Sequence, residues 1–249
     1  MRAVIPKSGM NIIYFFRSVI VLLLVVPVIT VITALAVIFG VLILRIKPAT
    51  IKMAPRVWSR IIAVASGVKV RVEGMENLEN GRPYIFAANH QSQYDIFALD
   101  GYFMVDFRWV AKKELYRIPL VGHAMGLAGT VFIDRSKGRQ AIKSLAEAAK
   151  RIADGTSVVV FPEGTRSQDG KLQPFKSGAM YLAIKSGVDI VPLAIKGGFE
   201  IMPKSSFLTR PGNMVIRVGK PIAVSNFDQK QKQELADILH DKVEALMGE

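Results

Sequence analysis

"YIFAANHQSQYD", residues 84–95, is an apolar run that stops abruptly at a polar cluster. Residues 84–89 lack the alternation of a half-exposed strand, so they predict a strand covered on both faces. Strands of this kind are typical of mostly parallel sheets flanked by helices. The polar cluster, which contains His90 and Asp95, would then lie at the carboxyl end of the strand, where α/β proteins place their sites.

Six other segments share this texture and are separated by glycine, proline or asparagine. They comprise residues 68–74, 107–112, 130–134, 157–161, 189–195 and 214–219. Residues 139–155 and 228–247 instead repeat apolar positions at three- and four-residue steps, which predicts two helices. We therefore expect an α/β fold, with a central mostly parallel sheet covered by helices, over residues 67–249.

The amino-terminal part has a different composition. Residues 1–72 contain ten Lys or Arg and no Asp or Glu, in a chain of formal net charge +13. Residues 18–44 carry no charge, and this run exceeds the roughly 20 residues that cross a bilayer core. A cleavable signal peptide is the competing interpretation, but the apolar run continues well past the candidate cleavage site at 34–36. Residues 1–66 are therefore predicted to form membrane-anchoring helices on an anionic phospholipid bilayer, and their apolar content argues against nucleic acid as the partner.

Two poses are open for this segment. It either spans the bilayer or bends at Pro27 and Gly40 into a hairpin with both basic ends on one side. The heavier basic flank follows the run, which favours the inner (cytoplasmic) membrane with the globular part facing the cytoplasm. Beyond it, Lys52, Arg56 and Arg60 recur four residues apart, which predicts an interfacial helix with its cations toward lipid headgroups.

His90 and Asp95 are the first candidate site. Five residues along one helix turn the chain by about 500°, so these two side chains cannot share a helix face. They meet only if His90 lies in the turn before the helix. The carboxylate would then hold one imidazole nitrogen and leave the other as a general base. The alternative is helix capping, because Ser92 to Asp95 resembles a capping box.

The segment FPEGTRS, residues 161–167, is the second candidate site. Gly164 allows close approach of the backbone, Thr165 offers a hydroxyl, and Arg166 provides a planar fork suited to phosphate. These groups in one short loop after a strand predict an anion site. The alternative is a charged loop with a local ion pair between Glu163 and Arg166.

Further cations, Lys112, Lys113 and Arg135, lie at or just beyond the ends of two other predicted strands. Each alone is a common solvated charge, but parallel strands would bring all these clusters to one edge of the sheet. Other chemistry is not indicated, because the chain has no cysteine, its three histidines lack metal-site spacing, and no nucleotide-binding glycine motif is present. We expect neither a metal nor a bound cofactor.

Four motifs, NHQSQYD, GTVFIDR, FPEGTRS and VPLAI, occur in the order and approximate spacing of the motif blocks of the glycerolipid acyltransferase family. Over about residues 69–220 the chain resembles that family, and within it the bacterial-type 1-acyl-sn-glycerol-3-phosphate (lysophosphatidate) acyltransferases. The resemblance implies that His90 is the general base and Asp95 its orienting partner. It also implies a glycerol-phosphate site and an acyl-donor side. The residues concerned are Lys112, Arg135, Glu163, Gly164, Thr165 and Arg166 for the phosphate, and Pro192 for the donor.

The implied reaction moves an acyl group from acyl-CoA or acyl carrier protein, as co-substrate, to the sn-2 hydroxyl of lysophosphatidate in the membrane. The product would be phosphatidate, in phospholipid biosynthesis. Two alternatives stay open. One is the same chemistry on glycerol 3-phosphate or another lyso-lipid, and the other is a non-catalytic membrane protein that binds anionic lipid.

Overall fold

The chain folds around one seven-stranded sheet with the order β1-β7-β6-β2-β5-β3-β4. The computed structural model describes residues 12–134 and 139–248. The strands are β1 (Val68–Glu73), β2 (Ile85–Ala88), β3 (Arg108–Lys112), β4 (Val131–Ile133), β5 (Val158–Val160), β6 (Ile190–Lys196) and β7 (Gly212–Val218). Each coincides with a predicted strand. All neighbouring strands pair in parallel except β6 with β7, which confirms the mostly parallel sheet.

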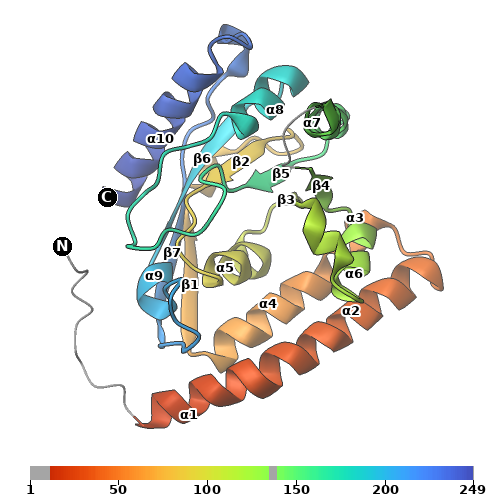
Figure 1. Cartoon of the computed structure of the whole chain (residues 1–249), viewed down its shortest axis with the longest axis vertical. Helices are drawn as coiled ribbons and strands as arrows, with labels where there is room; N and C mark the ends of the chain where they lie inside the picture. Colours follow the sequence, from red (N-terminus) through yellow and green to blue (C-terminus); the bar gives the residue numbers. More distant parts are fainter. Residues whose placement is uncertain (1–11, 135–138, 249) are drawn as a thin grey trace.

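Helices cover both faces of this sheet (Figure 1). They are α1 (Ile12–Ile20), the π-helical η1 (Val21–Val25), α2 (Val26–Leu42), α3 (Pro48–Ile51), α4 (Met53–Ala65), α5 (Tyr94–Tyr102), α6 (Val121–Leu127), α7 (Arg139–Ala153), α8 (Gly178–Ser186), α9 (Gly198–Ile201) and α10 (Lys232–Gly248). Short 3-10 helices are η2 (Met75–Asn77), η3 (Lys113–Arg117) and η4 (Val224–Asn226). The two helices predicted from periodicity correspond to α7 and α10.

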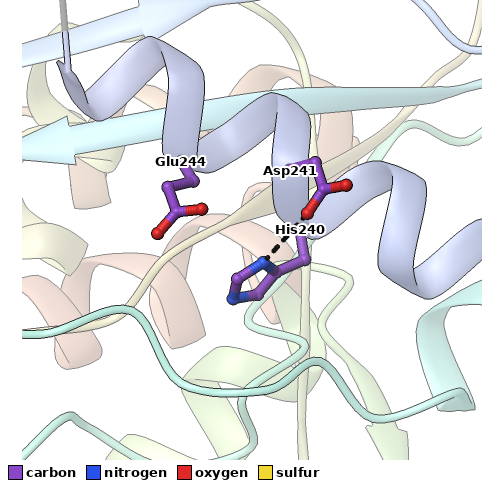
Figure 2. Close-up of side chains that lie close together, drawn as sticks. All are labelled: His240, Asp241 and Glu244. Carbon is purple, nitrogen blue, oxygen red and sulfur yellow. Dashed lines mark ion pairs between the residues drawn. The ribbon is translucent and has the colours of Figure 1, made fainter.

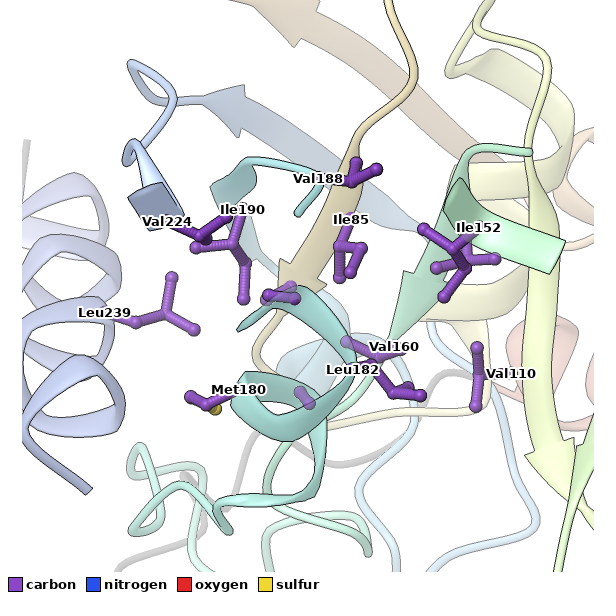
Figure 3. Packing of buried hydrophobic residues seen from close by; sticks show 14 of the residues in the cluster. Ile85, Val110, Ile152, Val160, Met180, Leu182, Val188, Ile190, Val224 and Leu239 are labelled. Carbon is purple, nitrogen blue, oxygen red and sulfur yellow. The ribbon is translucent and has the colours of Figure 1, made fainter. Parts of the chain in front are cut away.

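The central strands are buried on both sides, which explains their unbroken apolar sequence. Ile85 and Val160 point into one core with side chains of α7, α8 and α10, including Met180, Leu182 and Leu239 (Figure 3). The intervening side chains point the opposite way because successive strand residues alternate faces. They form a second core, lined by α4 and α5.

The amino-terminal helix runs without a break from Ile12 to Leu42, so the bend at Pro27 and Gly40, one of the two poses left open by the sequence, does not occur there. Proline removes an N–H donor and its ring crowds the carbonyl four residues earlier. The π-helical turn η1, just ahead of Pro27, absorbs this mismatch. The chain reverses only after the helix, at Arg45, where φ is +54°. The helix is long and apolar enough to cross a membrane, which suggests that the chain is membrane-associated.

Helix α4 buries one of the three cations that the sequence places on a single helix face. Arg56 is buried, and Arg60 donates from Nε to the carbonyl of Gly101 in α5 at 2.7 Å. Most of the exposed side chains of α4 are apolar, and these are Met53, Val57, Ile61 and Val64, but Arg60 is exposed as well. Lys52 pairs with Asp106 at 3.5 Å, so the three cations do not form one uniformly exposed face. An apolar stripe of α4 lies on the outside, and the interfacial position of this helix stays a prediction.

Candidate functional site

The chain leaves the sheet at His90 because Asn89 continues the strand ladder with its side chain. Its Nδ2 donates to the carbonyl of Ile195 at 2.9 Å, and its Oδ1 accepts from the N–H of Ile195 at 2.6 Å. The carbonyl of His90 then accepts from the N–H of Ser167 at 2.8 Å. The turn that carries His90 is thus tied both to β6 and to the FPEGTRS loop, so the two predicted clusters meet at the carboxyl ends of β2 and β5.

His90 and Asp95 are in direct contact, with Nδ1 at 2.9 Å from Oδ2. Helix α5 begins at Tyr94, so His90 lies in the turn ahead of it, as the helix geometry requires. Asp95 is fully buried, whereas the His90 side chain is 13% exposed. A carboxylate is an acceptor, so Nδ1 carries the proton and Nε2 keeps a lone pair. The arrangement leaves Nε2 able to take a proton from a hydroxyl.

Capping and the contact with His90 coexist in this turn. Besides His90, Asp95 Oδ2 accepts from the N–H groups of Gln91 and Ser92, at 2.7 and 2.8 Å. The Ser92 hydroxyl accepts from the N–H of Tyr94 and donates to the carbonyl of Met202 at 2.8 Å. Ser92 is thus buried and engaged with main-chain groups, which does not suit a covalent nucleophile.

Glu163 holds main-chain N–H groups in place and does not have the geometry of a phosphate contact. Its Oε1 accepts from the N–H of His90 at 2.5 Å, and its Oε2 accepts from the N–H of Gln173 at 3.2 Å. Both oxygens are therefore used inside the protein, and a carboxylate would repel a phosphate. Within residues 12–134 and 139–248, Glu163 forms no ion pair with Arg166, so the local pair weighed as the alternative is not formed.

Burial raises the pKa of Glu163 to about 7, although the two N–H donors act in the opposite direction. The folded protein therefore retains a proton that the unfolded chain releases near pH 4.5. We expect the contribution of Glu163 to the free energy of unfolding to be greatest below that pH and to be lost as the pH rises toward 7. Denaturant titrations of the wild type and Glu163→Gln at pH 5 and 8 measure this. The fall in the free energy of unfolding between these two pH values should be smaller in Glu163→Gln, and an identical fall in both proteins would contradict the assignment.

Gly164 makes room for a cation that the sequence did not point to. Its φ is +77°, and a Cβ atom there would lie only 2.9 Å from the ammonium of Lys176. A second ammonium, of Lys204, lies 3.2 Å from the hydroxyl of Thr165. Arg166, the residue that follows Thr165, is half-buried. Among the described residues, none of these three cations has a carboxylate partner within 4.0 Å, so the loop retains uncompensated positive charge.

The remaining predicted cations differ in their surroundings. Lys112 is exposed at the end of β3, and the neighbouring Lys113 lies 3.7 Å from Asp134 across the edge strands. This separates the two lysines, which the sequence left as equivalent, and favours Lys112 as the cation open to a ligand. Arg135 lies outside the described residues, so its place at the site stays a prediction.

A cavity of about 350 Å³ opens beside this loop. Its lining is mostly apolar, with Lys176 and Asp134 as its charged members. The residues are Val110, Ile133, Asp134, Ala141, Leu145, Val160, Phe161, Pro162, Gly164, Lys176, Gly178, Ala179 and Leu182. Pro192 is buried in β6, opposite Ala87, and does not line this cavity. Its role on the acyl-donor side stays a prediction.

A separate group of potential metal ligands lies on α10 and comprises His240, Asp241 and Glu244 (Figure 2). His240 Nδ1 is 3.6 Å from Asp241 Oδ1, but the Asp241 side chain is 82% exposed. The His240 ring packs edge-on against Phe175, with 5.3 Å between centroids. These residues form a solvated helix surface, and we assign no functional role to them.

The fold and the site together define an α/β protein with a His–Asp pair beside a cationic loop at the carboxyl edge of its sheet, and a long apolar helix at its side. A family model described as Acyltransferase matches residues 69–196, and the chain belongs to this acyltransferase family. Curated relatives carry a more specific name. A 1-acyl-sn-glycerol-3-phosphate acyltransferase of Saccharomyces cerevisiae is 37% identical over 192 residues, which cover 76% of this chain and 63% of the relative.

A protein of the same name from Chlamydomonas reinhardtii is 40% identical over 65% of this chain and 49% of its own length. The chain thus matches less than two thirds of the length of these relatives. A crystal structure of the 1-acyl-sn-glycerophosphate (LPA) acyltransferase PlsC from Thermotoga maritima superposes with a TM-score of 0.79 at 25% identity. That match covers 95% of this chain and 97% of the other.

Proposed function

We propose that this protein transfers an acyl group from a thioester to the sn-2 hydroxyl of lysophosphatidate and forms phosphatidate. The observation that carries the proposal is the His90 imidazole, held at Nδ1 by the buried Asp95 and flanked by the cationic 163–166 loop. A base of this kind beside an anion site fits an acceptor with a free hydroxyl and a phosphate. The names of the curated relatives support the same acceptor.

The first step of the proposed reaction is set by the free lone pair on Nε2 of His90 and the proton of the lipid hydroxyl. Nε2 of His90 takes the proton of the lipid hydroxyl while the oxygen attacks the carbonyl carbon of the thioester. A new C–O ester bond forms, the C–S bond breaks, and the imidazolium returns its proton to the departing sulfur. Asp95 stabilises the imidazolium and holds it in place throughout. The transfer requires neither a covalent enzyme intermediate nor a metal, because the thioester is already an activated acyl group.

Phosphate recognition falls to the cations around the 163–166 loop. Arg166 can offer two parallel N–H donors, and Lys176 and Lys204 add ammonium groups from other parts of the chain. Gly164 and Thr165 supply a close main chain and a hydroxyl. The exposed Lys112 and the predicted Arg135 complete this set in our proposal, whereas Glu163 braces the loop and the His90 main chain.

The acyl donor in this proposal is acyl-CoA or acyl carrier protein. The 350 Å³ cavity begins beside Phe161 and Gly164 and runs between β3, β5, α7 and α8. Its apolar lining suits a hydrocarbon chain, and we propose that it holds the acyl group during transfer. Pro192 would then act on the donor only through the packing of β6.

We further propose that the amino-terminal helix lies in one leaflet of an anionic bilayer, with the catalytic part on the cytoplasmic side of the inner membrane. The helix stays against the body along much of its length. Ser18 Oγ accepts from the N–H of Thr209 at 2.6 Å, and Thr30 Oγ1 accepts from Trp58 Nε1 at 2.9 Å. A helix crossing the bilayer would leave these partners behind. The exposed apolar stripe of α4 lies beside it and would enter the same leaflet.

Arg166→Ala tests the phosphate contact. Charge-assisted hydrogen bonds of this kind contribute about 1.5–3 kcal/mol, so KM for lysophosphatidate should rise roughly 10- to 100-fold with a smaller change in kcat. Arg71→Ala is the matched control, because Arg71 is an exposed arginine of β1 paired with Glu73. If both variants keep the wild-type KM, or if acceptors without a phosphate lose as much as lysophosphatidate, Arg166 does not bind the phosphate.

A further inference from the structure

The His90 imidazole lies flat against the ring of Phe161. The two centroids are 3.9 Å apart, and the ring planes differ by 11°. Phe161 directly follows β5, the strand that pairs with β2, so the two rings meet across neighbouring strand ends. Its phenyl ring covers one face of the imidazole.

A second ring supports this stack from behind. Trp109 of β3 lies 5.6 Å from Phe161 at an interplanar angle of 27°. The indole N–H of Trp109 donates to Asp100 Oδ1 in α5 at 3.0 Å, which holds the tryptophan in turn. Trp109 lies opposite Val159 in the sheet register, so its place is set by the strand ladder. The stack of three rings is therefore anchored in the sheet at Trp109 and ends at the imidazole of His90.

The hydrogen bond that Nδ1 of His90 donates to Asp95 does not fix the imidazole on its own. It holds one ring atom, Nδ1, but the χ2 torsion of a histidine is broad, so the ring plane can still tilt about this contact. Nε2 lies across the ring from Nδ1, and any tilt moves its lone pair. A flat surface at van der Waals distance removes that freedom.

We propose that Phe161 is a positioning residue that, with Trp109 behind it, sets the plane of the His90 imidazole and so the direction of the Nε2 lone pair. The role of Nε2 as the base rests on the function proposed above. Phe161, the first residue of FPEGTRS, thus contacts the histidine, while the later residues of the motif bind the anion. The turn that carries His90 and the FPEGTRS loop therefore act together.

Core packing is the competing explanation, since Phe161 is half-buried and contacts the second core. The two explanations differ in what they require of the side chain. Core packing requires apolar volume, which leucine or methionine largely supplies. Positioning requires a flat face, which tyrosine supplies and leucine and methionine do not. Phe227 is the matched control, because it is half-buried against the core on the other face of the sheet.

The test compares Phe161→Leu, Phe161→Met, Phe161→Tyr and Phe227→Leu in the full-length protein in lipid–detergent micelles. In Phe161→Leu and Phe161→Met we expect kcat to fall on the order of tenfold with KM nearly unchanged. This loss is smaller than the roughly 100-fold that a full misplacement of 1 Å costs. Phe161→Tyr should restore most of kcat, and Phe227→Leu should retain wild-type kcat. The positioning role is overturned if Phe161→Leu keeps wild-type kcat, or if Phe227→Leu loses as much.

A readout that does not use turnover separates this inference from the proposed function. In the nitrogen-15 spectrum of histidine-labelled protein, wild-type His90 should show one tautomer, with the proton on Nδ1. Phe161→Leu should broaden that signal or mix the tautomers, and Phe161→Tyr should not. A wild-type protein without transferase activity but with this pattern would refute the function and keep the positioning role. An unchanged His90 signal in Phe161→Leu would refute the positioning role itself.

Discussion

In the His90→Ala variant, kcat for acyl transfer to lysophosphatidate should fall by about 10²- to 10⁴-fold, the range that a positioned general base contributes. The effect should be on kcat rather than on KM, because the imidazole acts on the proton in transit while the cations of the 163–166 loop hold the phosphate. Initial rates at saturating lysophosphatidate and acyl-CoA measure this directly.

The matched control is His123→Ala. His123 is an exposed histidine of α6 whose ring contacts Tyr116, with 5.1 Å between centroids. Its removal should leave kcat unchanged. Undiminished turnover in His90→Ala would end the general-base mechanism. If the wild type also shows no transfer, while vesicle binding survives both His90→Ala and Arg166→Ala, the protein is a non-catalytic binder of anionic lipid.

The Gly198→Ala variant should lose about 100-fold in kcat, although this glycine lies outside the four motifs. Gly198 begins α9, and a Cβ atom there would collide with Asp95 Oδ1 and come within 3.0 Å of Ser92 Cβ. Asp95 is fully buried, and among the residues that the structure describes Oδ1 has no hydrogen-bond partner, so no contact from them draws the carboxylate back. The displaced carboxylate would carry the imidazole with it, and an error of about 1 Å costs on the order of 100-fold.

Gly212→Ala is the control for that variant, because its new Cβ would press on Ile201 of the same short helix at 3.1 Å without touching Asp95. Both variants should lose some stability, which thermal unfolding measures, but only Gly198→Ala should lose turnover at temperatures where both are folded. Wild-type kcat in Gly198→Ala would show that Asp95 tolerates the methyl group. Equal losses of kcat in both variants would assign the effect to α9 rather than to the His90–Asp95 pair.

The strands could be predicted from sequence because burial on both faces leaves a local signature of short, wholly apolar runs. The antiparallel pairing of β7 with β6 leaves none, since strand order depends on contacts between distant segments. The surroundings of the cations of α4 also leave no local signature. The burial of Arg56 and the contact of Arg60 with Gly101 depend on how α4 packs in the folded chain.

The candidate site divides in the same way. His90 and Asp95 are five residues apart, so helix geometry alone dictates how they can meet. Lys176, Lys204 and Gly198 arrive from other elements, and no local pattern marks them. Gly164 offered a usable signal, because a glycine in a charged loop often makes room for a neighbouring group.

Mass spectrometry can identify the lipid that forms when the purified protein receives lysophosphatidate with acyl-CoA or acyl-acyl carrier protein. We expect phosphatidate carrying the donor's chain at sn-2 from the wild type and almost none from His90→Ala. No phosphatidate from either donor, or the same yield with His90→Ala, would contradict the proposed acyl transfer.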